Sequence, residues 1–176
     1  MMFKKTKEEI LKENLESGLN GKVTDITIRR ANRVYSKCKG EDIWDVTKYL
    51  MEKLGFDYLC TITGADCGET INILYHWWHK DGTLFTVEAV TPAAKSEIKT
   101  ITDLIHGAIY YERELVDLLG VNVTGLPKGN RYPLPDDFPQ DQHPLRKSWD
   151  AVKYIKDQEN REAAVRKIQE DNACQR

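Results

Sequence analysis

Apolar residues recur at helical spacing in three parts of the chain. The first part is 6–19, the second is 42–54, and the third runs from 98 to 119. Repeats of three and four residues are typical of amphipathic helices, and glycine follows the second and third segments, where helices commonly end. We therefore expect three helices, and Gly107 leaves open a division of the third into two.

Alternating apolar and polar residues predict five strands. Two short runs lie between the first two helices, and three longer runs follow the second helix. Asp81-Gly82 separates the last two runs and is a strong hairpin signal. We therefore expect an antiparallel meander within an α+β fold, with helices packed on a small, mainly antiparallel sheet. The five runs are 23–29, 33–38, 58–63, 70–78 and 83–90.

The apolar pattern disappears from Gly120 to Lys147. Five of the six prolines lie between Pro127 and Pro144. A stretch of this length without regular structure is disordered, functional or laid along another surface, and composition does not choose among these. The segment that follows is highly charged and predicts a marginal helix that docks or frays. We therefore divide the chain into a core domain, an extended Pro-rich arm and a charged C-terminal helix or tail, at 1–120, 121–148 and 149–176.

Charge and hydropathy exclude several classes of function. The chain has 26 basic and 28 acidic residues, so its net charge of -2 provides no general attraction to nucleic acid. No apolar run approaches the roughly 18 residues of a membrane helix. After Met-Met-Phe the sequence continues directly with alternating charged residues and lacks the apolar stretch of a secretory signal. We therefore expect a cytoplasmic chain that does not span a membrane.

Four cysteines are scattered along the chain, and the nearest two are seven positions apart. Iron–sulfur clusters usually need four thiolates with several of them closely spaced, so this pattern does not favour a cluster. Without an export signal, a disulfide framework is also not expected. We therefore predict reduced thiols at Cys38, Cys60, Cys67 and Cys174.

The segment from His76 to His79 contains two histidines and two tryptophans. Side chains alternate along a strand, so His76 and His79 should point to opposite faces and cannot readily bind one metal ion. For the same reason, one of Trp77 and Trp78 should be buried and the other available. Exposed tryptophan and nearby lysines could bind single-stranded nucleic acid, but the near-neutral net charge argues against that alternative.

Two short motifs carry a family resemblance. The first is Glu112-Arg113-Glu114, followed by Asp117, two leucines and Gly120, and the second is the run 143–147, His-Pro-Leu-Arg-Lys. In this order they resemble signatures of the 30 kDa subunit family of respiratory complex I, and the similarity extends over about 42–149. Within 126–131 only the proline and the last arginine fit the complex I pattern. The run 134–139 is more similar to the homologous subunits of membrane-bound nickel–iron hydrogenases.

The resemblance implies a structural subunit of a membrane-associated electron-transfer complex. Such a subunit has no cofactor of its own, and the iron–sulfur clusters and nickel–iron site belong to partner subunits. Its partners are a large catalytic subunit of the complex I 49 kDa or hydrogenase type, an iron–sulfur small subunit and membrane subunits. The complex places it peripherally on the cytoplasmic side of the cell membrane. The expected interface residues are Glu112, Arg113, Glu114, Asp117, Arg131, His143, Pro144, Arg146 and Lys147.

The carboxylates between Glu112 and Asp117 allow a second interpretation. Neighbouring carboxylates on one helix repel each other unless an arginine or a partner's donors compensate them. Spacing alone favours a solvated charged face, whereas the family resemblance favours a basic partner. They could instead serve general acid–base catalysis in a self-contained enzyme, which would need a pocket beside this helix and turnover by the purified chain. No phosphate loop, nucleophile elbow or metal-ligand pattern supports the enzyme.

Overall fold

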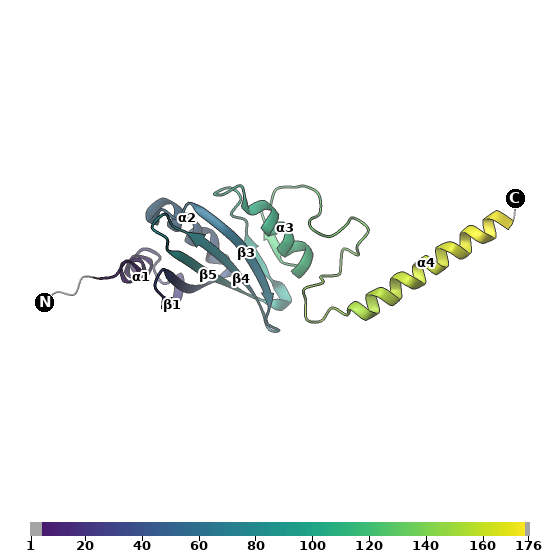
Figure 1. Cartoon of the computed structure of the whole chain (residues 1–176), viewed down its shortest axis with the longest axis horizontal. Helices are drawn as coiled ribbons and strands as arrows, with labels where there is room; N and C mark the ends of the chain where they lie inside the picture. The colour runs from purple at the N-terminus through teal and green to yellow at the C-terminus, as the bar shows by residue number, and fades with distance from the viewer. Residues whose placement is uncertain (1–4, 175–176) are drawn as a thin grey trace.

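The computed structural model describes residues 5–174, and side-chain burial as far as residue 167. Figure 1 shows a domain of helices and one large sheet, from which a last helix extends. Two single helical turns, Gly40–Asp42 and Ala93–Lys95, connect elements of the domain. The helices are α1 Lys7–Gly18, α2 Ile43–Leu54, α3 Ala108–Leu119 and α4 Ala151–Cys174. The strands are β1 Val23–Arg30, β2 Arg33–Lys39, β3 Tyr58–Asp66, β4 Thr70–Trp78, β5 Leu84–Pro92, β6 Glu97–Lys99 and β7 Asn122–Thr124.

The five longer strands form one sheet in the order β1-β2-β5-β4-β3. Only the pair β2 and β5 is parallel within this sheet, and the other three pairs are antiparallel. The predicted meander is confirmed, because β3 pairs with β4 and β4 pairs with β5 in sequence order. The chain therefore has the α+β fold and the mainly antiparallel sheet that its pattern predicts.

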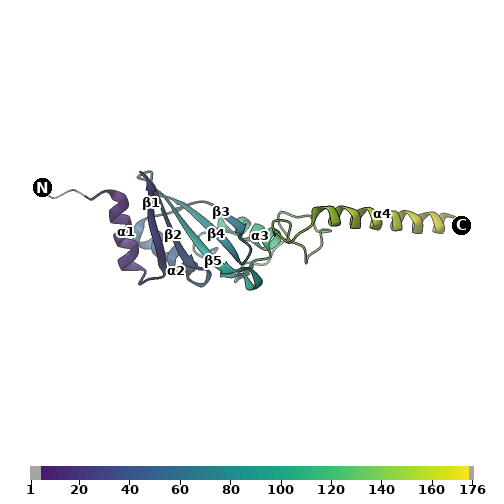
Figure 2. The same cartoon turned by 90° about the horizontal axis from the view of Figure 1, so that it is seen from below.

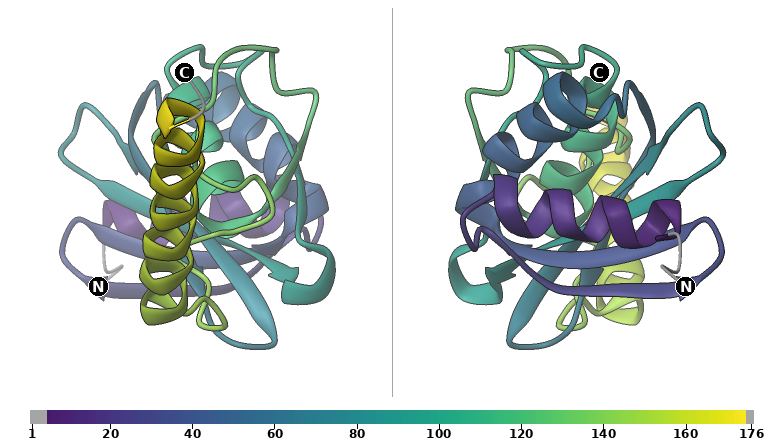
Figure 3. Two further views of the ribbon diagram at one scale, coloured as in Figure 1. Left: turned by 90° about the vertical axis from the view of Figure 1, so that its right-hand side faces the viewer. Right: turned by 90° about the vertical axis from the view of Figure 1, so that its left-hand side faces the viewer.

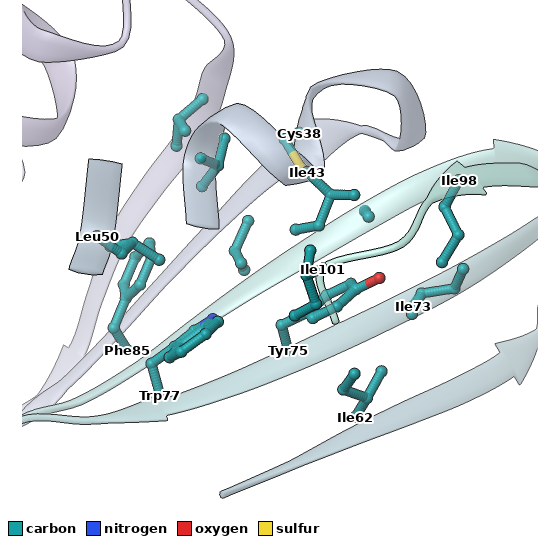
Figure 4. Packing of buried hydrophobic residues seen from close by; sticks show 14 of the residues in the cluster. Cys38, Ile43, Leu50, Ile62, Ile73, Tyr75, Trp77, Phe85, Ile98 and Ile101 are labelled. Carbon is teal, nitrogen blue, oxygen red and sulfur yellow. The ribbon is translucent and has the colours of Figure 1, made fainter. Parts of the chain in front are cut away.

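One face of the sheet forms the core. Along β4, Ile71, Ile73, Tyr75 and Trp77 have no exposed surface, while Trp78 is 43% exposed. The prediction that one tryptophan is buried and the other available is therefore confirmed. Helices α2 and α3 lie over the buried face (Figure 3), whereas the strands stand in front of the helices when the sheet is viewed from the other side (Figure 2). Figure 4 shows the core side chains between the sheet and α2.

Helix α3 packs closely on strand β3 at Gly64. A Cβ atom at this position would lie 2.2 Å from Leu119 Cδ1 and 2.7 Å from Leu115 Cδ2. The absence of a side chain therefore lets both leucines approach the backbone of the strand. Burial of large apolar side chains such as these stabilises the fold by about 1.5–3 kcal/mol each. Gly64 thus fixes the distance between α3 and the sheet.

The prediction of a helix beginning near Ile98 is wrong. Residues 97–99 form β6, which pairs in parallel with β7, and α3 begins only at Ala108. Ile98 lies opposite Val123, and both are buried. Long-range pairing therefore overrides the helical spacing of the apolar residues in this segment. It also places a short strand, β7, in the stretch that lacked any predicted regular structure.

Helix α4 follows the Pro-rich stretch and extends away from the domain into solvent (Figures 1 and 2). It begins at Ala151, two residues after the predicted start, and its described side chains include the exposed Val152, Ile155 and Val165. None of these three apolar side chains is buried against the domain. Among the helices of residues 5–174, none is both long and apolar enough to cross a bilayer.

Candidate functional site

The segment 121–148, here called the arm, folds back over α3 and is attached to it by an ion pair. Asp117 accepts a bond from Arg131 Nε at 2.6 Å and another from the Leu134 N–H at 3.0 Å. Arg131 also donates to the carbonyl oxygens of Phe138 and Pro139. The side chains of Asp117 and Arg131 are 9% and 14% exposed. Since charge-assisted hydrogen bonds are among the strongest, Arg131 joins the helix to two separate parts of the arm.

A second attachment involves His143 and the end of α3. The Nδ1 atom of His143 lies 2.9 Å from the carbonyl oxygen of Asp117, which can only accept, so this nitrogen carries the proton. The Leu145 N–H donates to the carbonyl of Leu118 at 2.9 Å. Gly120 ends the helix with a φ of +67°, and a Cβ there would lie 2.6 Å from the His143 ring. Gly120 therefore both ends α3 and makes room for His143.

A third attachment lies at the end of β3, away from α3. Arg146 Nη2 donates to the Ala93 carbonyl at 2.7 Å, and its Nε lies 3.6 Å from an Asp66 oxygen. The Lys147 N–H donates to the same carboxylate at 3.0 Å. Hydrogen bonds from the N–H groups of Gly68 and Lys147 lower the pKa of Asp66. The carboxylate therefore stays charged and holds the end of the arm against the sheet.

A small aromatic cluster joins the arm to the start of α4. The rings of Phe138 and Tyr154 are 5.0 Å apart, and Trp149 lies 5.7 Å from Tyr154. Phe138 is buried, and Trp149 Nε1 donates to Gln142 Oε1 at 2.9 Å. Because Tyr154 belongs to α4, this cluster connects the first turn of that helix to the arm.

Glu112 has no exposed surface and bonds within the chain. Its carboxylate accepts from Thr100 Oγ1 and, at 2.8 Å, from the Ile101 N–H. Burial raises the pKa of Glu112, and these two hydrogen bonds oppose that rise. Burial, with the nearby Glu112 charge, also raises the pKa of the enclosed Tyr75 hydroxyl. The prediction that Glu112 faces a partner is therefore contradicted. Glu112 instead anchors the β6 to α3 connection inside the chain.

A groove of about 470 Å³ lies between α3 and the arm. Arg113 lies at its side and donates from Nη2 to the carbonyls of Pro127 and Lys128, both at 3.4 Å. An added Cβ at Gly129 would lie 1.9 Å from that nitrogen, so a side chain there would displace the guanidinium. The groove is also lined by Val116, Asn130, Tyr132, Gln140 and His143.

The predicted interface residues separate into three groups. The first group, Asp117, Arg131 and His143, lies together where the arm contacts the end of α3, here called the base of the arm. A partner was expected to bring a positive charge to Asp117, but Arg131 of the same chain supplies it. Arg146 and Lys147 lie at the β3 attachment, and the side chain of Lys147 is exposed. The remaining members are Glu112, which is buried, and Arg113, Glu114 and Pro144, which are half-buried.

Sequence reasoning missed Asp66, which binds Arg146 and Lys147, and Thr100, which binds Glu112. Asp66 lies in the β3–β4 hairpin and Thr100 follows β6, so neither is near its partner in sequence. The sequence pattern assigns Asp66 only to a turn. No local pattern signals such contacts, because they depend on how the arm and the β6 to α3 connection fold back.

The geometry gives little support to acid–base catalysis by the three carboxylates of α3. Of the three, Asp117 lines the groove, and it is already paired with Arg131. Among the side chains of residues 5–167, no group of three or more potential ligands is placed to hold a metal ion. Cys38, Cys60 and Cys67 are free thiols, and burial raises the pKa of Cys38 to about 12. The side chain of Cys174 lies outside the described side chains.

Comparison with known proteins identifies the family. Residues 36–155 match the model described as the respiratory-chain NADH dehydrogenase, 30 Kd subunit. The chain belongs to this 30 kDa subunit family. The matched range includes α3, the whole arm and both sequence motifs, so the family assignment covers every attachment described above.

Relatives of the 30 kDa subunit family occur in several respiratory membrane complexes. Hydrogenase-4 component G of Escherichia coli strain K12 is 43% identical over 68 residues, which is 39% of this chain but 12% of that protein. One subunit of the F(420)H(2) dehydrogenase of Methanosarcina mazei is 26% identical over 141 residues, covering 78% of this chain and 89% of the relative. The chain thus spans only a small part of the hydrogenase relative.

A solved structure supports the fold over most of the chain. A chain in the structure of the membrane-bound sulfane sulfur reductase, an archaeal respiratory membrane complex, superposes with a TM-score of 0.75 and 28% identity. The similarity covers 86% of this chain and 89% of that chain. The homologues are therefore subunits of respiratory membrane complexes.

Proposed function

We propose that this chain is a structural subunit that docks on the large catalytic subunit of a membrane-associated electron-transfer complex. The observation that carries the proposal is the arm, whose charged and histidine side chains attach it to α3 and β3 at three places. These attachments involve both family motifs. They hold an extended Pro-rich surface in one shape, which suits a surface that docks on a partner.

Attachment of the arm before assembly has an energetic consequence. A segment that becomes ordered only on binding loses conformational entropy at that moment, which lowers affinity. In this chain the contacts of Arg131, His143 and Arg146 order the arm as the chain folds, before it binds a partner. The arm then presents a preformed surface, and the large subunit needs to order few residues.

The parent complex is of the membrane-bound nickel–iron hydrogenase type in this proposal. The 43% identity to the hydrogenase-4 component and the run 134–139 support that branch over complex I. The iron–sulfur clusters and the nickel–iron site then belong to the large and small partner subunits. The chain sits peripherally on the cytoplasmic side and contacts the membrane subunits through its complex.

Affinity purification from gently solubilised native membranes tests the proposal. The tagged chain should recover a large subunit that contains nickel or is accompanied by iron–sulfur proteins, as shown by mass spectrometry and metal analysis. Arg146→Ala should reduce this recovery, because it removes the contacts of the Arg146 side chain with Ala93 and Asp66 and leaves only the Lys147 N–H bonded to Asp66. Lys37→Ala, which removes an exposed pair with Asp25, is the matched control and should leave recovery unchanged.

Recovery of the chain alone, from membranes in which a known respiratory complex stays intact, would contradict the proposal. Equal recovery with the Arg146→Ala variant and the control would contradict the role of the arm. Measurement of the melting temperature of both variants separates loss of docking from loss of folding.

A further inference from the structure

The charged side chains of the α3–arm groove do not balance. Arg113, Lys128 and Arg131 line it together with one carboxylate, Asp117. Asp117 and Arg131 pair with each other. Arg113 and Lys128 have no ion-pair partner among the side chains that the structure describes. The groove is therefore positively charged and would attract an acidic ligand.

Arg113 is arranged to accept a carboxylate. Its two hydrogen bonds within the chain are long, both 3.4 Å, and both come from Nη2. The guanidinium has five N–H donors, so those on Nε and Nη1 remain for a ligand. These two nitrogens lie on different edges of the guanidinium, and a charge-assisted hydrogen bond from either one to a carboxylate is strong.

An exposed aromatic pair borders the same groove. Tyr132 lines it, and the ring of Tyr110 lies 5.4 Å from the ring of Tyr132, steeply inclined to it. Tyr110 is 57% exposed, Tyr132 is 40% exposed and Val116 is 37% exposed. Tyrosine and arginine are enriched among the residues that dominate binding at protein interfaces. The wall of the groove thus offers an apolar contact beside its positive charge.

The size and polar lining of the groove favour a peptide over a small anion. Its volume of about 470 Å³ exceeds that of a single water molecule, about 30 Å³, many times over. Asn130 and Gln140 also line it, and each amide can donate to and accept from a peptide backbone. A free phosphate would use the cations and leave the amides and the aromatic wall without contacts.

We propose that the α3–arm groove binds an extended acidic segment of the large subunit. An aspartate or glutamate of that segment pairs with Arg113 and lies near Lys128, and an adjacent apolar side chain packs on Tyr132 and Tyr110. The proposal rests on the proposed function, since the segment belongs to the large subunit. It assigns the groove, rather than the arm as a whole, as the site of charge recognition.

Site-specific photo-crosslinking tests the proposal in native cells. A photoreactive phenylalanine analogue at Val116 should link to one peptide of the co-purified large subunit, and that peptide should contain an aspartate or glutamate beside the linked residue. The same analogue at Ile28, which is 41% exposed on β1, is the control and should not capture that peptide. Crosslinking at Val116 should also weaken as salt concentration rises, because salt screens charge pairs.

Neutral variants test the role of the charges. The double variant Arg113→Gln, Lys128→Gln should lower the crosslink yield at Val116 by about tenfold or more, since hydrogen bonds to charged groups are strong. The double variant Lys39→Gln, Lys95→Gln removes two positive charges elsewhere and should leave the yield unchanged. If the first double variant melts at a much lower temperature, Lys128→Gln alone is used, because the described hydrogen bonds at Lys128 involve only its backbone.

The outcomes distinguish the two proposals. If no large subunit is recovered with the unmodified chain, both the proposed function and this inference are overturned. If the large subunit is recovered but the peptide at Val116 lacks acidic residues, or the Arg113 and Lys128 variant keeps its yield, only the inference fails. Saturable binding of inorganic phosphate that requires Arg113, with no acidic peptide captured, would likewise overturn it.

Discussion

Arg131 Nε donates to Asp117 at 2.6 Å, and both side chains are largely removed from solvent. The bond joins the first family motif to a residue of the arm 14 positions later in the chain. The bond attaches the arm to the charged C-terminal end of α3. Its strength therefore controls how often the arm leaves α3.

Arg131→Ala should release the arm without unfolding the sheet. Loss of one partner of a buried ion pair costs on the order of 3 kcal/mol, which raises the open fraction of the arm about a hundredfold. Trypsin cleavage after Lys128 should accelerate accordingly, because cleavage follows the open population. Arg166→Ala, which breaks an exposed pair with Glu162, should cleave at the normal rate. Equal rates for both variants would mean that other contacts hold the arm.

Glu112→Gln should change the dependence of stability on pH. Burial raises the pKa of Glu112 above its ordinary value of 4.5, so its contribution is full below that pH and is lost as pH rises through the folded-state pKa. The glutamine variant cannot ionise and should lack this loss. Urea denaturation at several pH values measures the difference between the two proteins. A difference that does not change with pH would show that Glu112 keeps its ordinary pKa in the fold.

Glu112→Ala should be more damaging than Glu112→Gln at every pH. The alanine leaves the Ile101 N–H without an acceptor inside the core, and the Thr100 hydroxyl keeps only Thr102 Oγ1 as an acceptor. An unsatisfied buried group costs about 1–3 kcal/mol and a lost hydrogen bond about 0.5–1.5 kcal/mol, so the total loss should reach about 1.5–4.5 kcal/mol. Glutamine keeps an oxygen that can accept, and its melting temperature should lie between those of the alanine variant and the native chain. A smaller loss for alanine would contradict the assignment of Glu112 as an anchor.

Gly120→Ala should displace His143 from the end of α3. The backbone there has a φ of +67°, and the new methyl group would lie 2.6 Å from the imidazole. Gly82→Ala is a matched control, since its φ is +88° and nothing lies within 4 Å of an added Cβ. Both variants incur a backbone penalty of about 1–2 kcal/mol, and only Gly120→Ala should also shift the NMR signals of His143. Identical behaviour of the two variants would exclude the steric role of His143.

Asp81→Asn should remove a loss of stability in acid. Burial tends to raise the pKa of Asp81, but hydrogen bonds from His79 and Thr83 prevail and lower it to about 2. A lowered pKa gives stability that is present above the ordinary value of 3.8 and is lost as pH falls toward 2. Urea denaturation between about pH 4 and pH 2 should therefore show a smaller decline for the asparagine variant. Lys7 Nζ also lies 3.8 Å from an Asp81 carboxylate oxygen, so protonation of Asp81 in the native chain should weaken this exposed ion pair with α1 as well.

The sequence pattern predicted the domain well where contacts are local. The apolar spacing of α1 and α2, the alternation in β4 and the Asp81-Gly82 turn each depend on neighbouring residues, and the structure has all of them. The pattern failed from Ile98 to Gly107, where β6 pairs with a strand more than twenty residues away. Helical spacing of apolar residues cannot reveal such a pairing.

The candidate site was predicted as a set of residues but not as an arrangement. The family resemblance named Asp117, Arg131 and His143, and the structure brings them together. The same resemblance placed Glu112 at the partner interface, and nothing in the sequence signals that Thr100 and Ile101 bind its carboxylate inside the fold. That the exposed residues of the predicted interface contact a partner stays a prediction.

The way in which α4 is joined to the domain also sets its mechanical behaviour. A pull along α4 would reach Tyr154 and its aromatic partners first, then Lys147 and Arg146 at Asp66, and only afterwards the base of the arm at Asp117. These bonds lie one after another along the chain, so each would carry the load alone. Tension on the C-terminal helix would therefore peel the arm away stepwise while the five-stranded sheet stayed intact.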